Sequence, residues 1–170
     1  MPQSVTAELA PLTEADFGAA LEVAQIIWRA HYAPMIGLAQ VDYMLGNRFT
    51  RQALSRYLGA DDRWFDLLRV DGAVVGYCSA ALTDAPGELK LEQLYLLPDQ
   101  QGRGLGGMML RHVEARARAE NCDRIMLLVA KRNTNSIAVY ERSGFTMREA
   151  VMIDIGEGYV MDDYVMEKRL

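Results

Sequence analysis

The sequence predicts an α+β fold in which helices flank a mixed, mostly antiparallel sheet of about six to seven strands. Three features carry this prediction. Two pairs of strand-like segments are joined by short glycine-containing turns, Asp71-Gly72 and Gly156-Glu157-Gly158, and such turns are typical of antiparallel hairpins. Between the two hairpins lies one strand–helix–strand stretch, which predicts a single central parallel crossover within an otherwise antiparallel sheet.

The first third of the chain is expected to hold one strand and two helical regions. Apolar residues alternate over residues 4–9, which is typical of a short strand. Thr13 and Asp16 have the spacing of a capping box. Apolar residues at helical spacing follow them up to Pro34, where this helix is expected to end. A second helical region is expected over residues 41–58, with an interruption near Gly46-Asn47.

Local patterns of the same kind define the rest of the chain. The Asp71-Gly72 turn is expected to join strands at residues 64–70 and 73–81. The wholly apolar run at residues 125–129 is typical of a strand that is covered on both faces. The other expected elements are a strand at 89–97, a helix that opens within residues 102–107 and runs to about residue 120, a short helix at 136–142, and hairpin strands at 145–155 and 159–168.

The composition is that of a soluble globular protein. Of the 170 residues, 51% are hydrophobic and 24% are charged, which predicts one domain over residues 1–170. The formal net charge of −5 disfavours binding of nucleic acid by the whole surface. Two cysteines (Cys78, Cys122) and two histidines (His31, His112) are too few for a disulfide framework or a metal site. Without a membrane-spanning run or a signal peptide, the protein is expected to be cytoplasmic, with no membrane partner.

The most informative segment runs from Gln101 to Gly107 and contains four glycines, Gly102, Gly104, Gly106 and Gly107. It follows a predicted strand and opens a predicted helix. Glycine allows the backbone to approach a ligand closely, and the first N–H groups of a helix have no partner inside the helix. Together with the positive end of the helix dipole, they predict a cradle for a phosphate or pyrophosphate group.

Two other interpretations of this segment are open. Gly102, Gly104 and Gly107 match the GxGxxG fingerprint of dinucleotide-binding domains. That fingerprint expects an acidic residue at the end of the next strand, whereas Lys131 and Arg132 stand there, and the remaining chain is too short for a doubly wound sheet. The segment could also be a purely structural turn that binds nothing.

Two motifs favour a third interpretation. Gln101-x-x-Gly104-x-Gly106 matches the Q/R-x-x-G-x-G/A signature of the GCN5-related N-acetyltransferases (GNAT), and residues 133–145 match that family's N-x-x-A-x-x-x-Y-E-x-x-G-F signature, with Ser136 in the place of the alanine. The sequence therefore resembles this superfamily. It is most similar to the spermidine/spermine N-acetyltransferases and related bacterial enzymes that act on small amines.

The resemblance implies an acetyl-CoA site and roles for individual residues. Tyr140 would be the general acid that gives a proton to the departing sulfur of the coenzyme. Main-chain groups of Leu94, Tyr95 and Leu96 would bind the pantetheine arm, which requires the two parallel strands to separate beyond Leu96. The remaining cofactor-binding residues implied by the motifs are Gln101, Gly102, Arg103, Gly104, Leu105, Gly106, Gly107, Asn133 and Ser136. No metal is implied, and the family leads us to expect a homodimer.

Glu92 is the candidate general base. An alkylammonium group has a pKa of about 10.4, so only about one molecule in a thousand is neutral near pH 7.4 unless a base removes the proton. Strand alternation would place Glu92 on one face with Leu94 and Leu96, and a carboxylate on an apolar face suits proton abstraction. Glu92 could equally bind the acceptor ammonium, or lie exposed and pair with Lys90.

Charge is unevenly distributed along the chain. Residues 103–132 contain seven basic and three acidic side chains, which suits a ligand rich in phosphate, although it also suits an ordinary solvated helix. Residues 149–163 contain five acids and no base, which would attract a cationic acceptor unless the segment is only a solvated hairpin. Trp28, His31 and Tyr32 either line the acceptor cleft or cap the core.

The sequence thus predicts an acetyl-CoA-dependent N-acetyltransferase. Its acceptor would be a small cationic primary amine, such as a polyamine or a basic amino acid, and transfer would be direct in a ternary complex. Acetylation of protein N-termini or lysines is the alternative within the enzyme class. A non-catalytic acetyl-CoA-binding regulatory module is the alternative from another class, but such a module would need neither Glu92 nor Tyr140.

Overall fold

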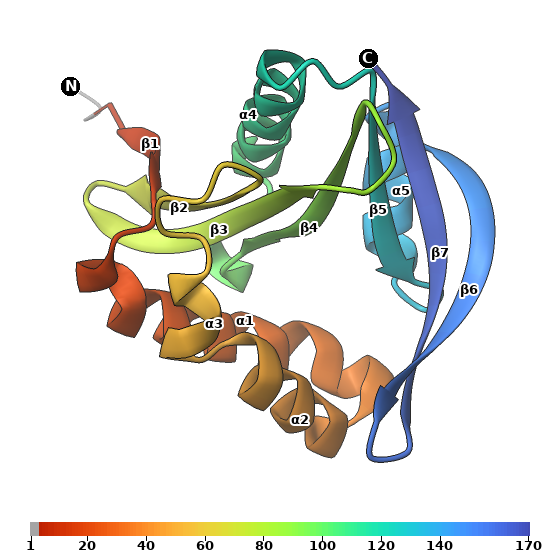
Figure 1. Cartoon of the computed structure of the whole chain (residues 1–170). Helices are drawn as coiled ribbons and strands as arrows, with labels where there is room; N and C mark the ends of the chain where they lie inside the picture. The colour runs from red at the N-terminus through yellow and green to blue at the C-terminus, as the bar shows by residue number, and fades with distance from the viewer. Residues whose placement is uncertain (1–3) are drawn as a thin grey trace. The chain divides into compact units, whose positions relative to one another are not determined.

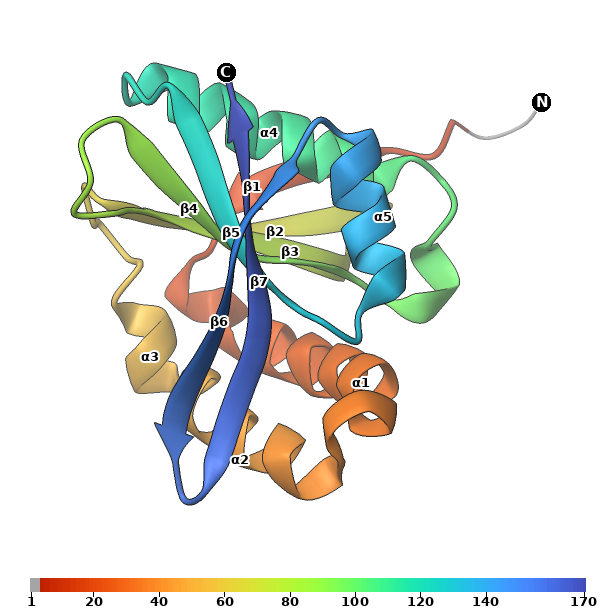
Figure 2. The ribbon, with the colours of Figure 1, turned by 90° about the vertical axis from the view of Figure 1, so that its right-hand side faces the viewer.

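The computed structural model describes residues 4–170 and contains one seven-stranded sheet flanked by helices (Figures 1 and 2). The strands are β1 (Ala7–Pro11), β2 (Arg63–Val70), β3 (Ala73–Leu82), β4 (Glu88–Leu96), β5 (Arg124–Ala130), β6 (Thr146–Gly156) and β7 (Tyr159–Arg169). The α-helices are α1 (Phe17–Ile36), α2 (Leu38–Arg48), α3 (Arg51–Ser55), α4 (Leu105–Ala119) and α5 (Thr134–Arg142), with 3₁₀ turns η1 (Glu14–Asp16) and η2 (Pro98–Gln100).

The strand order is β1-β2-β3-β4-β5-β7-β6. β4 and β5 pair in parallel and are connected through α4, whereas β1 with β2, β5 with β7 and β6 with β7 pair antiparallel. This confirms the predicted α+β class and the central crossover. No helix within residues 4–170 is long and apolar enough to span a bilayer.

The chain divides into two compact units, each made of two stretches of sequence. The first unit contains the residues up to Ala80 together with Gln93–Val113, and the second contains Ala81–Glu92 together with Glu114–Leu170. β3, β4 and α4 therefore each contribute residues to both units. The units are described separately below.

In the first unit, β1 pairs with β2 from Ala7↔Val70 to Pro11↔Asp66. The predicted turn that follows β2 has positive φ at both Asp71 (49°) and Gly72 (85°), as the tight primed hairpin turns require. The predicted capping box also forms. The Thr13 N–H and hydroxyl donate to the Asp16 carboxylate at 3.0 and 2.8 Å, and α1 begins one residue later.

The two helical regions before β2 differ from the prediction at their ends. α1 continues through Pro34 to Ile36 and ends at Gly37, whose φ of 84° lies in the left-handed region. Near a helix end, the loss of one N–H at a proline is tolerable, so the glycine gives the effective stop signal. The region expected at 41–58 is two helices, and Thr50 caps the second one by accepting a hydrogen bond from the Ala53 N–H at 3.0 Å.

The first unit has an aromatic core on α1, β3 and β4. Trp28 is 2% exposed, and its indole N–H donates to the hydroxyl of the fully buried Tyr77 at 3.0 Å. The Tyr77 ring stacks on Phe65 with centroids 5.3 Å apart and meets Tyr95 edge to face at 5.6 Å. Because Trp28 on α1, Tyr77 on β3 and Tyr95 on β4 are in contact, this core fixes the position of α1 against the end of β4.

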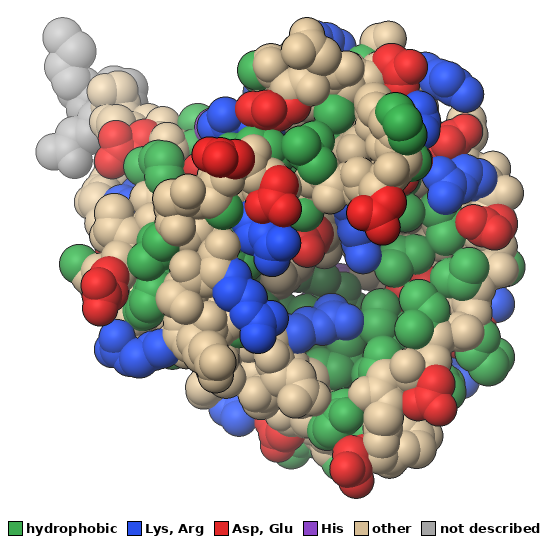
Figure 3. Space-filling view, in the orientation of Figure 1, with side chains coloured by type: hydrophobic (Ala, Val, Ile, Leu, Met, Phe, Trp, Pro, Cys, Tyr) green, Lys and Arg blue, Asp and Glu red, His purple; other side chains and the backbone are tan. Residues whose placement is uncertain are grey.

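In the second unit, β7 lies between β5 and β6 (Figure 2). β6 is an edge strand, and its pairing with β7 shifts register between Met147 and Glu149 and again between Asp154 and Gly156. Met152 and Ile153 on β6 are 69% and 38% exposed. Hydrophobic side chains accordingly gather on the right of Figure 3, where Figure 1 draws this hairpin. Of the four methionines of this hairpin, only Met166 is buried.

Glu88, at the start of β4, is the buried ionic centre of the second unit. Its carboxylate is 7% exposed and accepts hydrogen bonds from the Thr83 hydroxyl (2.8 Å), Arg124 (3.1 Å) and Arg148 (3.2 Å). Burial alone would raise the pKa of Glu88, but these three donors outweigh it and hold the pKa below the ordinary value of 4.5.

Glu88→Gln is expected to lower the free energy of unfolding at pH 7 by about 1.5–3 kcal/mol, because charge-assisted hydrogen bonds are lost in a buried site. Since the folded-state pKa is depressed, the contribution of Glu88 is fully present above about pH 4.5 and disappears as the pH falls through the folded-state value. Urea unfolding of both proteins between pH 7 and pH 3 measures this. The exposed substitution Glu157→Gln is the control, and a difference that does not depend on pH would contradict the assignment.

Candidate functional site

The glycine segment forms an open turn that joins β4 to α4 in the first unit. Gly102 and Gly104 both have φ near +78°, in the left-handed region, and α4 begins at Leu105. A Cβ atom added at either glycine would meet no heavy atom within 4 Å. The backbone conformation, rather than a lack of space, therefore requires glycine at these two positions, and the surface of the turn is accessible to a ligand.

The turn presents a row of backbone donors. In the part of the chain that the structure describes, the backbone N–H groups of residues 102–107 have no hydrogen-bond acceptor, and the first N–H bonded within the turn is that of Met108, to the Gly104 oxygen at 3.2 Å. Six consecutive N–H groups at the positive end of a 15-residue helix are well suited to hold an anion. The residues present thus fit the pyrophosphate group of a coenzyme.

Side chains around the turn add positive charge. The Arg103 guanidinium donates to Gln100 Oε1 at 2.8 Å on the surface. A Cβ added at Gly107 would lie 3.2 Å from Nη1 of Arg111, so this guanidinium lies over the first turn of α4. The Gln101 N–H differs from those that follow it, because it points to the Pro98 oxygen at 3.5 Å.

The parallel pairing of β4 with β5 is short. It covers only Glu88–Leu91 against Arg124–Leu127, while β5 remains paired with β7 as far as Ala130↔Asp163. The ladder therefore stops at Leu91, five residues earlier than the expected separation beyond Leu96. Leu94, Tyr95 and Leu96 lie in the part of β4 that follows the end of this ladder, as main-chain binding of a ligand there requires.

β4 also departs from regular pairing with β3. The Leu97 N–H donates to the Val75 oxygen, and the Thr83 N–H donates to the Glu88 oxygen. Between these two bonds β4 has one residue more than β3, which is typical of a β-bulge. Near Leu97 the strands approach closely: a Cβ added at Gly76 would lie 2.5 Å from the Tyr95 carbonyl oxygen, so position 76 requires glycine.

The aromatic residues expected either at the acceptor cleft or in the core differ in burial. Trp28 belongs to the core. His31 and Tyr32, near the end of α1, are half-buried, and the Tyr32 hydroxyl hydrogen-bonds the Tyr95 hydroxyl. The ring of His31 lies 4.7 Å from that of Tyr32 and 6.4 Å from that of Tyr95. Burial lowers the pKa of His31 below its ordinary value of 6.5, so this ring is neutral at neutral pH.

In the second unit, α5 carries three of the predicted site residues. Asn133 is buried and caps the helix, because its Oδ1 accepts a hydrogen bond from the Ser136 N–H at 3.3 Å. Tyr140 is half-buried, and its ring meets that of Phe145 edge to face with centroids 5.5 Å apart. The Phe145 N–H donates to the Tyr140 carbonyl oxygen at 3.0 Å, which fixes the turn after the helix. Glu92, half-buried on β4, is also in this unit.

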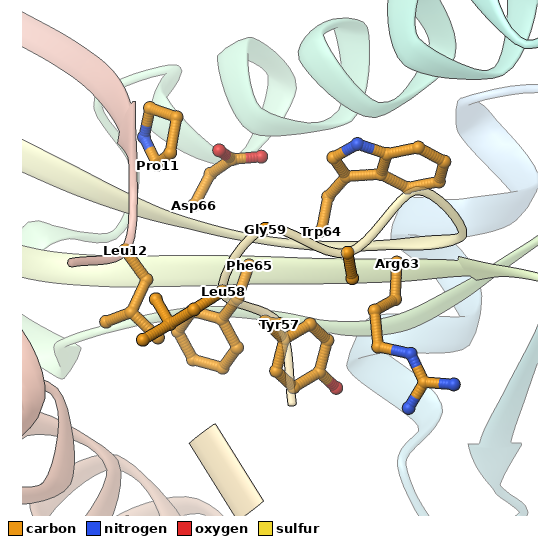
Figure 4. Close-up of a pocket in the computed structure, with 10 residues that line it drawn as sticks. Pro11, Leu12, Tyr57, Leu58, Gly59, Arg63, Trp64, Phe65 and Asp66 are labelled. Carbon is orange, nitrogen blue, oxygen red and sulfur yellow. The ribbon is translucent and has the colours of Figure 1, made fainter. Parts of the chain in front are cut away.

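The first unit also contains a cavity of about 190 Å³ that is separate from the glycine turn (Figure 4). It is lined by the end of β1, the segment after α3 and the start of β2. Trp64 and Asp66 point to one side of β2, and Tyr57 and Phe65 point to the other. The Asp66 carboxylate is hydrogen-bonded to His112 Nε2 at 3.1 Å. The cavity contains none of the predicted site residues.

The cysteines fit no catalytic role. Cys78 and Cys122 are both buried and unpaired by disulfides. Burial raises the pKa of each thiol, and the Asp66 carboxylate raises that of Cys78 further, so both are protonated at neutral pH. Within residues 4–170, no three His, Cys, Asp or Glu side chains are placed to hold a metal ion.

Comparison with known proteins matches the chain to one family. Residues 22–145 match the model of the "Acetyltransferase (GNAT) family". The chain is 36% identical over 95 residues to a mycothiol acetyltransferase of Salinispora tropica, covering 50% of this chain and 31% of that protein. It is 29% identical over 86 residues to a streptothricin acetyltransferase of Streptomyces lavendulae, covering 51% of this chain and 46% of that protein. The chain thus spans less than half the length of these two relatives.

Among solved structures, the PaiA N-acetyltransferase of Thermoplasma acidophilum, in complex with coenzyme A, superimposes with a TM-score of 0.84 at 20% identity. The match covers 97% of this chain and 99% of that one, and it shows that the two proteins share a fold. The family match covers most of the chain and includes both motifs that the sequence presents. The chain therefore belongs to the acetyltransferase (GNAT) family.

Proposed function

We propose that the protein is an acetyl-CoA-dependent N-acetyltransferase that transfers the acetyl group directly to a primary amine in a ternary complex. The observation that carries the proposal is the row of six unpaired N–H groups in the Gly102–Gly107 turn, a donor set suited to a pyrophosphate. The family match and the shared fold support it. Acetyl-CoA, when bound, supplies an acetyl group that is activated as a thioester.

The remaining roles belong to the chain. The amine nitrogen attacks the thioester carbon, the carbon–sulfur bond breaks, and the sulfur leaves with a proton. In this proposal Tyr140 donates that proton, and Glu92 accepts the proton that the amine loses, directly or through a water. Main-chain groups of Leu94–Leu96 bind the pantetheine arm and stabilise charge on the carbonyl oxygen. Asn133 and Ser136, at the start of α5, are further cofactor contacts.

Glu92→Gln is expected to lower the rate about 10-fold at pH 7, and the loss should shrink as the pH approaches the pKa of the amine. At higher pH more of the acceptor is already neutral, so a base is needed less. The test is a pH profile of kcat/KM for the acceptor, with the exposed α1 substitution Glu22→Gln as control. A loss of equal size at every pH would instead assign Glu92 to binding of the acceptor.

The acceptor is proposed to be a small cationic amine, as in the spermidine/spermine enzymes that the sequence resembles. The β6–β7 hairpin carries acidic residues at its tip, Asp154 and Glu157, which would attract such a substrate. Release of free CoA, measured with a panel of spermidine, lysine-like amines and short peptides, tests the proposal. If peptides alone are acetylated, the protein acetyltransferase alternative holds. Binding of acetyl-CoA without turnover of any amine would favour the regulatory module.

A homodimer is proposed on the basis of the family resemblance, and the edge strand β6 is the surface best suited to it. Met147, Met152 and Ile153 are exposed along this strand, and exposed apolar edges commonly mark interaction sites. Sedimentation velocity is expected to show a dimer, which Met152→Glu should dissociate. A monomer in the unmodified protein would contradict this.

A further inference from the structure

Two buried oxygen atoms in the first unit have no hydrogen-bond partner among residues 4–170. They are Oγ of Ser79 on β3 and Oε1 of Gln93 on β4. Ser79 is only 1% exposed. Buried polar side-chain atoms are nearly always hydrogen-bonded, because leaving one unpaired is energetically costly. Two such atoms on neighbouring strands therefore call for a partner outside the chain, either a buried water or a ligand.

Both atoms belong to strands that also carry aromatic residues of the first unit, Tyr77 on β3 and Tyr95 on β4. The strands β3 and β4 are neighbours, and the rings of Tyr77 on β3 and Tyr95 on β4 meet edge to face with centroids 5.6 Å apart. Ser79 follows Tyr77 by two residues, and Gln93 precedes Tyr95 by two, a distance of about 7 Å along each strand. Strand alternation on β3 places Ser79 on the face of Tyr77, and Gln93 lies within the stretch of β4 that contains the bulge.

The two atoms select one kind of ligand chemistry. A glutamine Oε1 only accepts hydrogen bonds, and a serine Oγ can accept them. A primary amine has two or three N–H donors and can serve both atoms, whereas a carboxylate has none. Tyr95, two residues after Gln93 on β4, is also favourable to a cation, because aromatic faces attract positive charge.

We propose that Ser79 and Gln93 form an amine-binding subsite, in which Ser79 Oγ and Gln93 Oε1 accept hydrogen bonds from N–H groups of the acceptor. The subsite rests on the proposed acetyl transfer to an amine and deepens it: these two residues determine specificity for a nitrogen acceptor. They do not react, and neither is part of the acetyl-CoA motifs.

The test compares Ser79→Ala and Gln93→Met with the exposed control substitutions Ser55→Ala on α3 and Gln25→Met on α1, using spermidine or whichever amine of the panel the unmodified enzyme acetylates best. Each subsite variant is expected to raise the KM for that amine about 5- to 10-fold. The kcat and the calorimetric dissociation constant of acetyl-CoA should stay within about twofold. Gln93→Glu, which keeps the acceptor oxygen and adds a negative charge, should retain or lower the KM for a cationic amine.

Thermal unfolding gives an independent measurement. Ser79→Ala removes an unpaired hydroxyl, so the Tm should stay the same or rise, whereas a hydroxyl that stabilises the fold would give a lower Tm. An unchanged KM in both subsite variants of an otherwise active enzyme would overturn this inference alone and would assign the two atoms to a buried water. If the unmodified protein acetylates no amine, the proposed function fails, and the subsite fails with it.

Discussion

Tyr140→Phe is expected to lower kcat for amine acetylation about 100-fold while leaving the dissociation constant of acetyl-CoA within about twofold. A positioned general acid contributes about 10²–10⁴-fold to a rate, and the substitution removes only the hydroxyl that would give a proton to the sulfur. The ring contact with Phe145, with centroids 5.5 Å apart, is retained, so the helix should keep its packing. Steady-state kinetics and calorimetric titration with acetyl-CoA measure the two quantities separately.

The chain offers a closely matched control for this substitution. Tyr57 is also half-buried and meets a phenylalanine, Phe65, edge to face at 5.3 Å. Tyr57→Phe removes the same hydroxyl from the same kind of ring contact, and it should leave kcat unchanged. If Tyr140→Phe weakens acetyl-CoA binding strongly but leaves kcat intact, Tyr140 is a cofactor-binding residue and not the acid.

Gly104→Ala is expected to weaken acetyl-CoA binding about 30-fold. Gly104 has φ near +78°, a conformation that costs a residue with a side chain about 1–2 kcal/mol. Relief of that strain would rotate the peptide groups on either side and turn their N–H groups away from the anion. Calorimetric titration with acetyl-CoA, and separately with free CoA, measures the loss, which should be similar for the two ligands because both carry the pyrophosphate.

Gly158, at the tip of the β6–β7 hairpin, has the same φ of 78° and the same open space around it. Gly158→Ala therefore imposes the same backbone strain at a position outside the Gly102–Gly107 turn, and it should leave the affinities for acetyl-CoA and free CoA unchanged. Equal affinities in the Gly104→Ala variant and the unmodified protein would show that this turn does not hold the coenzyme, and the proposed function would lose its main support.

Elements with strong local signals were predictable from the sequence. The Asp71-Gly72 turn, the apolar strand β5 and the helix that follows the glycine segment all lie where they were expected. In each case residues close together in the sequence determine the conformation. α1 ends two residues beyond the predicted stop at Pro34, because the positive φ at Gly37 ends the helix.

The candidate site was predictable only where its residues lie close together in the sequence. The glycine turn and the α5 motif are contiguous in sequence, and the structure gives the turn the expected unpaired N–H groups. Placement of Glu92 with Leu94 and Leu96 assumed a regular strand. The bulge in β4 removes the basis for simple alternation there, and no residue type in this segment signals it. Ser79 and Gln93 belong to no motif, and only their lack of partners in the folded chain draws attention to them.

The sharing of β3, β4 and α4 between the two compact units limits how the protein can be divided. The chain passes from one unit to the other three times, after Ala80, Glu92 and Val113. A fragment that ends at Val113 would keep every residue of the first unit, but the complementary fragment would lack the strand that pairs in parallel with β5. It would also leave Arg124 and Arg148 without the buried Glu88 carboxylate. Neither half of the gene is thus a sound basis for a truncated expression clone.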